Sequence, residues 1–366
     1  MYNILMFGTG RMSIWAENVL NNDVNILAYV DNDSSRWDST RNGKIVVGPD
    51  KIEKYNYDYI IIGSQFNQEI YGQLIDMRVD NDKILQFSVF IDNCFNYYKY
   101  NLDKFISSSE KIELMTTGIS YAEIGFSEHI CCKKSFKFAV RHQDLFYDYH
   151  TVKYILKNFP QKAAHIKYVL IGLCYYSFQY DMSLSAMANK TVIYYPILKT
   201  AHHFKNIEKV YEGYRINKNI ADNIFRKNQK GNYDFKWDMP TTLKDYSDKW
   251  KIGRESAVRD CNKNYPKTAA ENESIFVEYL KFLKNYNIKP IVLVYPVTRY
   301  YSKYFSDKIE EEFHSIINKT RQKYDFQYID YFRSDLFDDD DFGDVSHLNW
   351  RGAEKFTRIL NKEIDW

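Results

Sequence analysis

The sequence predicts an α/β protein in which a small Rossmann-like parallel-sheet domain precedes a larger α/β/α domain. Three observations predict this. Short apolar runs that fit buried strands alternate with helical patterns, two such series follow one another, and a length of 366 residues is enough for two hydrophobic cores. Continuous apolar strands are typical of a parallel sheet covered on both faces.

The first series lies at the start of the chain. An apolar spacing that fits a helix begins at Met12 and includes Trp15 and Val19. Apolar runs on either side of this helix read as strands at residues 3–8, 25–31, 45–47 and 59–64. We therefore expect a Rossmann-like domain over residues 1–92.

The pattern restarts near residue 94 and predicts a second domain over residues 93–366. Its expected strands lie at residues 113–118, 136–140, 165–173, 289–296 and 326–329. A helix is expected over 271–286, with Thr268 as its cap. Residues from about 200 to 265 are polar, rich in Asn and Lys, and carry no strand pattern. We interpret them as a mostly helical insertion, which would either cover the active site or decorate the surface.

The charge and hydropathy of the chain exclude several classes of partner. The formal net charge is +2 with acids and bases mixed, and without a basic stripe nucleic acid is not an expected partner. No window approaches the roughly 18 apolar residues of a spanning helix, so no membrane span is predicted. Residues 1–8 lack the basic region of a signal peptide.

Neither the cysteines nor the acidic run predicts a metal site. The 5 cysteines are scattered without a zinc-binding spacing, which favours reduced thiols and a cytoplasmic location. Four consecutive acids at 338–341 fit a solvated loop, because neighbouring carboxylates cannot converge on one ion.

The motif Gly118-Ile119-Ser120 stands between an expected strand and an expected helix, and Gly125 follows it. Open α/β sheets bind ligands at the carboxyl ends of their strands, and the N–H groups at a helix start favour a developing oxyanion. These features make Ser120 a candidate nucleophile. Taken alone, a serine at such a turn more often only caps the helix.

A second motif, Asp344-Val345-Ser346-His347, precedes the last expected helix. At this spacing the carboxylate of Asp344 can meet one imidazole nitrogen of His347 and leave the other for a serine. That is the arrangement a general base needs for serine acylation. In isolation, His347 would better fit a histidine of a surface loop.

Together the two motifs resemble the first and last blocks of the SGNH (GDSL-like) hydrolase family, over roughly residues 110–366. The resemblance implies Ser120 as nucleophile, His347 as general base and Asp344 as its orienting acid, with no cofactor required. Ile119 stands where the family usually has Asp. That Asp does not belong to the catalytic triad.

The middle blocks of the family supply a Gly and an Asn to the oxyanion hole, and here both are atypical. The second block reads Phe138 to Asp144, and the third, Ile171 to Ser177, contains no Asn. The candidate donors to the oxyanion are the backbone N–H of Ser120, a backbone N–H near Arg141, and the hydroxyl of Tyr175 or Tyr176. Loss of one donor typically costs about 10²–10³ in rate.

The N-terminal domain carries a glycine-rich turn, Gly8-Thr9-Gly10-Arg11, between a strand and a helix. Asp31 ends the next strand about 20 residues later, as in a dinucleotide fingerprint. Ser13 replaces the third glycine of that fingerprint. The expected ligand-binding residues are Gly8, Thr9, Gly10, Arg11 and Asp31.

This domain also resembles the small Rossmann-like domain of bacterial polysaccharide-biosynthesis enzymes, including some sugar acetyltransferases. The motifs that carry this resemblance are Phe7-Gly8-Thr9-Gly10, Tyr29-Val30-Asp31-Asn32-Asp33 and Ile60-Ile61-Ile62-Gly63-Ser64. The resemblance implies a nucleotide or nucleotide-linked sugar as ligand. The alternative is a degenerate domain that only packs or dimerises, and the sequence leaves open whether the chain forms a homo-oligomer.

The leading hypothesis is a cytoplasmic serine-dependent O-acyl esterase or acyltransferase. It would act on a carbohydrate, commonly on an acetyl ester, in bacterial surface-polysaccharide metabolism. One alternative is a non-catalytic nucleotide-sugar-binding protein with a degenerate SGNH scaffold. A weaker one is an NAD(P)-dependent oxidoreductase that uses Gly8, Gly10 and Asp31. The sequence does not separate esterase from transferase, nor does it give the substrate or the acyl donor.

Overall fold

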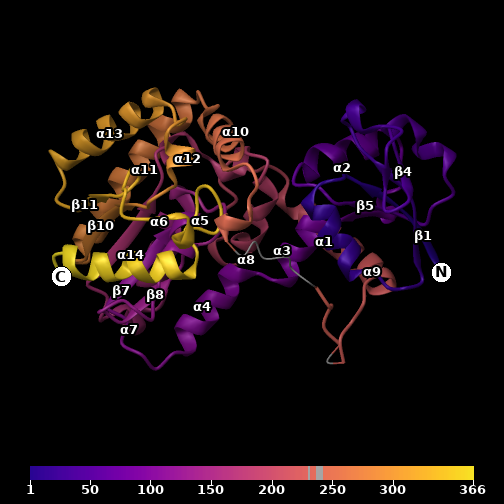
Figure 1. The fold of residues 1–366 in the computed structure, drawn as a ribbon. Coiled ribbons are helices and arrows are strands. Elements are labelled where there is room, and N and C mark those ends of the chain that lie inside the picture. The colour runs from indigo at the N-terminus through magenta and orange to yellow at the C-terminus, as the bar shows by residue number, and fades with distance from the viewer. Residues whose placement is uncertain (230, 236–241) are drawn as a thin grey trace. The chain divides into compact units, whose positions relative to one another are not determined.

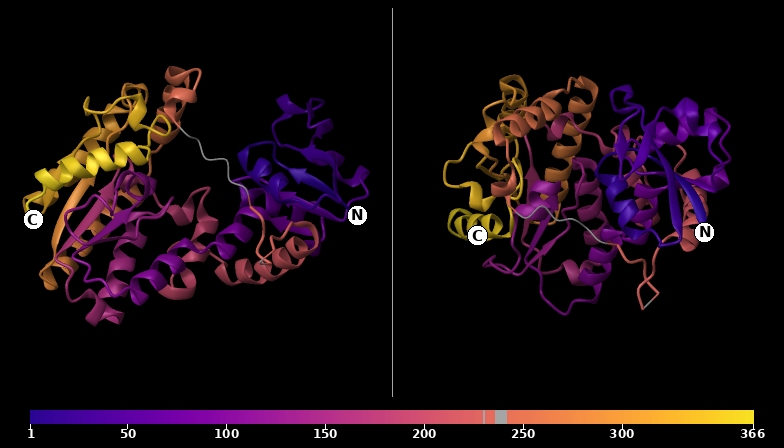
Figure 2. Two further views of the ribbon diagram at one scale, coloured as in Figure 1. Left: turned by 60° about the horizontal axis from the view of Figure 1, so that its bottom comes forward. Right: turned by 45° about the vertical axis from the view of Figure 1, so that its right-hand side comes forward.

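The structure, a computed structural model, describes residues 1–229, 231–235 and 242–366. It is an α/β protein with two sheets, which confirms the predicted fold class. Two compact units divide the chain (Figures 1 and 2). One unit contains Met1–Asn96 with Ser183–Met239, and the other contains Tyr97–Met182 with Pro240–Trp366. No helix of the described ranges combines the length and apolar character needed to cross a bilayer.

The sheet of the N-terminal unit has six strands in the order β3-β4-β2-β1-β5-β6. All pairings are parallel except that between β3 and β4. The predicted strands are confirmed, whereas the two- and three-residue strands β3 and β6 were not predicted. The strands are β1 (Tyr2–Phe7), β2 (Val24–Val30), β3 (Thr40–Arg41), β4 (Lys44–Val47), β5 (Tyr59–Ile62) and β6 (Ile84–Gln86).

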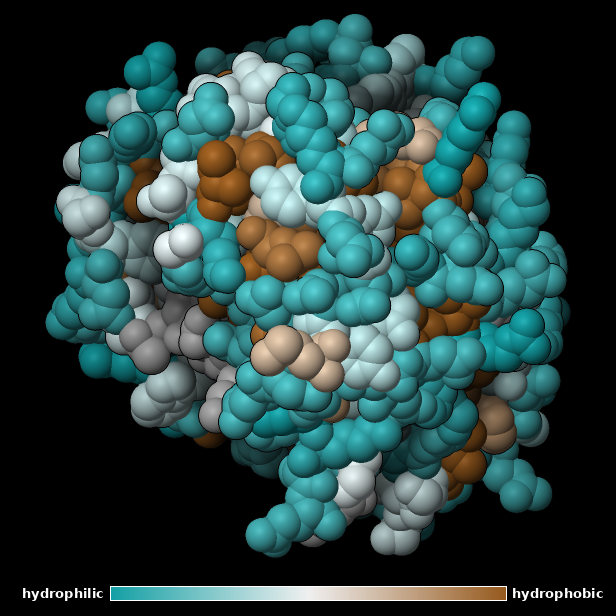
Figure 3. All heavy atoms as spheres, turned by 90° about the vertical axis from the view of Figure 1, so that its right-hand side faces the viewer, coloured by the Kyte–Doolittle hydropathy of each residue, from teal (hydrophilic) through white to brown (hydrophobic). Residues whose placement is uncertain are grey.

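Alternate residues of β1 enter two separate cores, as the two-residue period of a strand requires. Ile4 and Met6 pack with α1 (Arg11–Val19), α3 (Phe87–Cys94) and α9 (Ile207–Ile224) on one face. Leu5 and Phe7 pack with α2 (Asn67–Asp76) on the other face. The outer surface that Figure 3 shows is mostly hydrophilic, with apolar patches that are separate from one another.

Helix α9 differs from the expectation for residues 200–265. Ile220, Ala221 and Ile224 are buried in the core of the N-terminal sheet, and the backbone N–H of Gln86 in β6 donates to Asn217 Oδ1 at 2.8 Å. The expected single insertion is therefore divided. Its described residues up to 235 belong to the N-terminal unit, and α10 (Lys249–Cys261) belongs to the C-terminal unit.

The sheet of the C-terminal unit is entirely parallel, in the order β11-β10-β9-β7-β8. All five predicted strands are confirmed. They are β7 (Leu114–Gly118), β8 (Ser135–Lys137), β9 (Tyr168–Leu173), β10 (Lys289–Val294) and β11 (Gln327–Asp330). The chain leaves β7 for β8 on one side and later adds β9 on the other. The carboxyl end of β7 is thus the topological switch point, where open sheets bind ligands.

Helices cover both faces of this sheet. Helices α6 (Leu145–Asn158) and α11 (Pro266–Asn285) pack together on one face, and α5 (Ser120–Gly125) packs with α14 (Trp350–Glu363) on the other. Figure 1 shows α14 running beside α5. The other helices described in this unit are α4 (Tyr97–Ser107), α7 (Pro160–Ala163), α12 (Arg299–Ser302) and α13 (Asp307–Arg321), whereas α8 (Tyr195–Leu198) belongs to the N-terminal unit.

The acidic run is not a solvated loop as predicted, because it forms a short 3₁₀ helix, Asp339–Asp341, capped by Asp338. Asp341 is 1% exposed and lies 2.6 Å from Lys355 Nζ and 3.8 Å from Arg351 Nε. Its backbone carbonyl accepts from the N–H of Asn349 at 2.8 Å. The acidic run therefore anchors the start of α14, directly after the Asp344–His347 motif.

Candidate active site

Ser120 is the first residue of α5, immediately after β7, where the switch point lies. Gly118, two residues before Ser120, has φ +133°, a conformation that favours glycine. The N–H of Gly118 donates to Oδ1 of Asp148 at 2.9 Å, and burial raises the pKa of the Asp148 carboxyl well above its usual range. Within the described ranges nothing accepts from the backbone N–H of Ser120, so this donor is free.

The Asp344–His347 loop is shaped by its own carboxylate. Oδ1 of Asp344 accepts the backbone N–H groups of Ser346 and His347, both at 2.8 Å. These bonds turn the chain back on itself and bring the imidazole of His347 onto the same carboxylate. Thr298 holds the loop from outside by donating its hydroxyl to the carbonyl of Val345.

The structure brings the three predicted catalytic residues together. Nδ1 of His347 lies 3.0 Å from both carboxylate oxygens of Asp344, and Nε2 lies 2.8 Å from Oγ of Ser120. A carboxylate can only accept, so Nδ1 carries the proton and Nε2 accepts from the Ser120 hydroxyl. This is the hydrogen-bond order of a nucleophile, a base and an orienting acid.

The electrostatics keep Asp344 ionised. Burial of the carboxyl would raise its pKa, but the charge of His347, the imidazole hydrogen bond and the two backbone N–H groups outweigh burial. Together they lower the pKa of Asp344 to about 2. The carboxylate is therefore negative across the neutral range and stabilises an imidazolium at His347.

Three of the four oxyanion candidates have other partners. The hydroxyl of Tyr175 donates to Asp330 at 3.1 Å. Asp330 ends β11, three strands from β7 and hence roughly 14 Å away across the sheet. Tyr175 was therefore a wrong prediction for this role. The backbone N–H and the guanidinium of Arg141 both face the carboxylate of Glu123 in α5.

The hydroxyl of Tyr176 faces the hydroxyl of Tyr121, and Lys263 Nζ lies 4.7 Å from the centre of the Tyr176 ring. Tyr176 is thus near the site, although its hydroxyl has a partner. The free N–H of Ser120 remains the best-supported donor to an oxyanion.

Sequence reasoning missed Tyr121, whose ring stacks on the imidazole of His347. The ring centres are 4.7 Å apart and the planes differ by 25°. The only signal was its position directly after the nucleophile, which puts it in the first turn of α5. No local pattern in the sequence indicates Tyr301, which contacts the Tyr121 hydroxyl, or Asp260, to which Tyr301 donates.

The glycine-rich turn of the N-terminal unit has the conformation that its sequence predicts. Gly8 has φ +110°, and a Cβ there would lie 2.7 Å from the carbonyl oxygen of Gly63. Oγ1 of Thr9 donates to Asp31 at 2.6 Å, and Arg36 lies 3.5 Å from the same carboxylate. The backbone N–H of Asp33 also donates to Asp31, at 3.0 Å. Asp31, which would hold a ribose in a dinucleotide site, thus already has three partners of its own.

Gly10 caps α1, and Arg11 is its first residue. Ser13, which stands in place of the third glycine, is fully buried and donates its hydroxyl to the carbonyl of Gly10 at 2.6 Å. The close helix–strand approach is supplied from the other side, because a Cβ on Gly63 would lie 2.7 Å from Cα of Ser13. Helix α1 therefore packs closely on the sheet without the third glycine.

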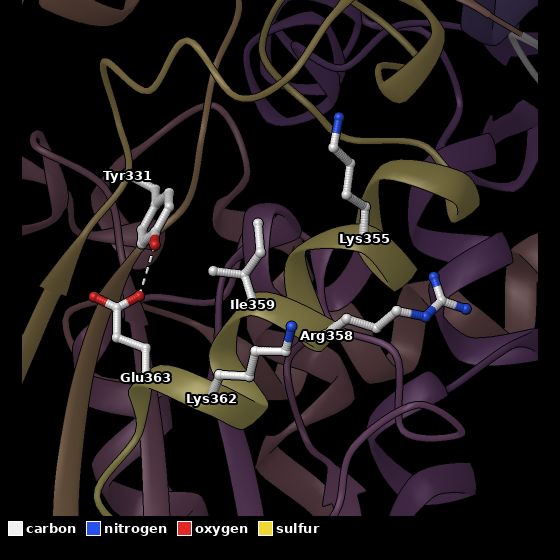
Figure 4. A pocket seen from close by; sticks show the side chains of 6 residues that line it. All are labelled: Tyr331, Lys355, Arg358, Ile359, Lys362 and Glu363. Carbon is white, nitrogen blue, oxygen red and sulfur yellow. Dashed lines mark hydrogen bonds between the residues drawn. The ribbon is translucent and has the colours of Figure 1, made fainter.

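Two surface pockets of the C-terminal unit are not lined by the triad. One, of about 490 Å³, lies against α14 and is lined by Tyr331 and by residues of that helix (Figure 4). Tyr331 donates to Glu363 across it at 2.6 Å. The other, of about 520 Å³, lies beside α10 between Trp250 and Tyr304. The triad is identified by hydrogen-bond geometry and not by a cavity.

Comparisons with known proteins give partial matches. Residues 1–85 match the family model "C2185-like, N-terminal", and residues 244–362 match the model of the DltD protein family. DltD proteins are an SGNH-like family of acyltransferase or esterase type, which supports an enzyme of that general class. The second match contains Asp344 and His347 and begins after Ser120. No curated protein matches the chain.

Among solved structures, the chain is similar to UDP-D-quinovosamine 4-dehydrogenase from Vibrio fischeri. The identity is 17%, and the match covers 22% of this chain and 74% of the other. The TM-score is 0.18, which carries no weight for the fold or the activity.

Proposed function

We propose that this chain is a serine-dependent O-acyl esterase or acyltransferase in which Ser120, His347 and Asp344 form the catalytic triad. The observation that carries the proposal is the continuous hydrogen-bond series from Ser120 Oγ through the imidazole to the Asp344 carboxylate. Its position at the switch point of the parallel sheet supports the same role.

The reaction follows from these contacts. Oγ of Ser120 attacks the carbonyl carbon of an ester while Nε2 of His347 takes the hydroxyl proton. The tetrahedral oxyanion receives the free backbone N–H of Ser120. The carbon–oxygen bond to the leaving alcohol then breaks, and the imidazolium returns its proton to that oxygen. This leaves an acyl-serine and a neutral His347.

The second half repeats these steps with a new hydroxyl. Water would release the acid and make the protein an esterase, whereas a sugar hydroxyl would take the acyl group and make it an acyltransferase. The match to the DltD family supports acyl transfer as the general class. We propose a carbohydrate ester, commonly acetyl, as the substrate, because the N-terminal unit resembles domains of polysaccharide-biosynthesis enzymes.

A fluorophosphonate probe tests the nucleophile directly. Wild-type protein should be labelled at Ser120, and Ser120→Ala should lose the label. Ser274→Ala is the matched control, because Ser274 lies exposed on α11 in the same unit and donates only to a backbone carbonyl. An unlabelled wild type, or undiminished labelling of Ser120→Ala, would contradict the proposal.

A second measurement separates the two reaction types. The acyl-enzyme formed from p-nitrophenyl acetate is offered sugars as acceptors, and the products are separated by mass. Acetylated sugar in excess of free acetate supports a transferase, whereas acetate alone supports an esterase.

One observation favours a second candidate, a nucleotide-sugar-binding protein without catalysis. No oxyanion donor from the third block replaces the family's Asn, since the Tyr175 hydroxyl is bound to Asp330. Thermal shifts with nucleotide-sugars, with and without Thr9→Val, test ligand binding at the N-terminal turn. A shift with nucleotide-sugars together with an absence of Ser120 labelling would favour this candidate. A shift with NAD(P) instead would favour an oxidoreductase.

A further inference from the structure

The aromatic wall beside the triad connects His347 to a second carboxylate. Tyr121 is 5% exposed, so its ring lies between the imidazole and the protein interior. The hydroxyl of Tyr121 faces those of Tyr301 and Tyr176. Tyr301 donates in turn to Oδ2 of Asp260, at 2.9 Å.

The direction of these hydrogen bonds follows from the last partner. The carboxylate of Asp260 only accepts, so Tyr301 gives it its single proton and can only accept from Tyr121. Tyr121 is thereby the donor in its contact with Tyr301. A phenol that donates toward a carboxylate gains electron density, and that density extends over the ring that faces His347.

Asp260 is held in place by the packing of α10. Gly253 of this helix approaches α12 so closely that a Cβ there would lie 2.2 Å from the carbonyl oxygen of Tyr300. Lys263 donates to the backbone carbonyl of Asp260 at 2.7 Å. The end of α10 is therefore fixed at the distance from Tyr301 that the hydrogen bond requires.

We propose that Tyr121 is a positioning residue for His347, and that Asp260 strengthens its effect through Tyr301. This inference rests on the proposed triad and adds a second carboxylate, Asp260, which belongs to neither of the two catalytic motifs. The stack fixes the plane of the imidazole, so that Nε2 stays directed at Ser120. It also stabilises the imidazolium that forms when Ser120 loses its proton, because a cation is attracted to an electron-rich ring.

The charged and titratable groups around this unit are few among the described residues. Asp344 faces His347 directly, and the neighbours of Tyr121 are Tyr176, Tyr301, Asp260 and Cys174. Two cations lie further out, Lys263 beside the Tyr176 ring and Arg259 at 3.8 Å from Asp260. Of these, Asp344 stabilises the imidazolium of His347 most, because it contacts the imidazole directly. The stack with Tyr121 should also stabilise the imidazolium, but by a smaller amount.

The first test measures the imidazole itself and does not need catalysis. The imidazole resonances of His347 are followed by NMR at one neutral pH and assigned with His347→Gln. Tyr121→Leu should shift these resonances, because the ring that stacks on the imidazole is lost. Tyr121→Phe, Tyr301→Phe and Asp260→Asn keep a ring at position 121 and should shift them by less. Tyr331→Phe, a surface tyrosine bonded to Glu363, should leave them unchanged.

The second test measures the rate of fluorophosphonate labelling against pH. Tyr121→Leu should reduce the rate about 3- to 30-fold, and the pH profile of the rate should change with it, because the imidazolium loses the ring that stabilises it. Tyr121→Phe keeps the stacked ring and removes only the hydroxyl, so it should keep most of the wild-type rate.

Unchanged His347 resonances in folded Tyr121→Leu and Asp260→Asn variants would overturn the inference, even if Ser120 labels normally. An unlabelled wild type would instead remove the proposed function, while the NMR resonances still decide whether Tyr121 acts on His347.

Discussion

Gly118 and Gly172 face each other in the register of β7 and β9, and neither position has room for a Cβ atom. A Cβ on Gly118 would lie 2.5 Å from the carbonyl oxygen of Gly172. Ser120 follows two residues later, so the position of the nucleophile depends on this contact between two strands.

Gly118→Ala should therefore damage both stability and the site. The added methyl group meets backbone and must occupy a positive φ, which together should cost about 2–4 kcal/mol. Thermal unfolding and the rate of Ser120 labelling should both fall. Gly72→Ala is the control, because a Cβ at Gly72, inside α2, meets nothing within 4 Å. Equal effects of the two substitutions would contradict this prediction.

Asp344→Asn should leave the fold intact and lose activity. The amide can donate to Nδ1, which favours the tautomer with a proton on Nε2 and removes the acceptor that Ser120 needs. A loss on the order of 10³–10⁴ in labelling rate is expected. Asp335→Asn, an exposed position in the same unit, serves as the control. A loss of less than about tenfold would exclude Asp344 as the orienting acid.

The same carboxylate predicts an acid dependence of stability. The folded-state pKa of about 2 lies below the ordinary value of 3.8, so the unfolded chain binds the proton first as the pH falls. The stabilisation by Asp344 is complete above about pH 4 and is lost as the pH falls toward 2. Allowing for its partial exposure, we expect about 1–2 kcal/mol.

Denaturant unfolding of wild type and Asp344→Asn from pH 6 to pH 2 measures this contribution. The difference between the two proteins should shrink across the lower half of that range. A difference that stays constant with pH would contradict the lowered pKa of Asp344 in the folded protein.

Asp341 and Asp340 are neighbours with unequal roles. Asp341→Ala should cost about 1–3 kcal/mol, because a buried acceptor of Lys355 is lost. Asp340 only pairs with Lys244 at the surface, so Asp340→Ala should cost less than about 1 kcal/mol. Chemical denaturation of the two variants gives the comparison. Equal costs would indicate that the acidic run is solvated after all.

Ile224→Ala tests whether α9 belongs to the core of the N-terminal sheet. Ile224 is fully buried there, so the substitution should cost about 2–4 kcal/mol. Hydrogen exchange should rise in β1 and β2, whereas β7 and β9 should be unaffected. The exposed Ile45 provides Ile45→Ala as the control. Faster exchange in β7 rather than β1 would assign α9 to the other unit.

Much of the fold could be predicted because the buried parallel strands are continuous apolar runs. Strands β3 and β6 escaped because two or three residues are too few for a pattern. Helix α11 starts at Pro266 and not at the expected cap Thr268, since proline suits the first turn, where its missing N–H costs nothing.

The role of α9 could not be predicted locally. Its apolar residues are spaced as in a helix, but Asn and Lys fill the positions between them. Which of the two sheets this stripe covers is decided by contacts with residues about 200 positions earlier, such as the bridge between Leu20 and Phe225.

The candidate site divides in the same way. Ser120 and the Asp344–His347 loop could be predicted, because a strand-to-helix turn and an Asp-x-x-His loop are local features. Tyr301 and Asp260 could not, because each meets the site only through side chains on other elements. Tyr175 was wrongly proposed since sequence position alone cannot tell which strand end a tyrosine hydroxyl reaches.

The division of the N-terminal unit into two segments has a consequence for synthesis. Residues up to Asn96 leave the ribosome with one face of their sheet covered only by α1 and α3, and about 130 residues follow before Ile224 emerges. At 5–20 residues per second, that interval is roughly 6 to 25 s. The nascent N-terminal sheet therefore waits for its last helix while the first three strands of the C-terminal sheet are being made.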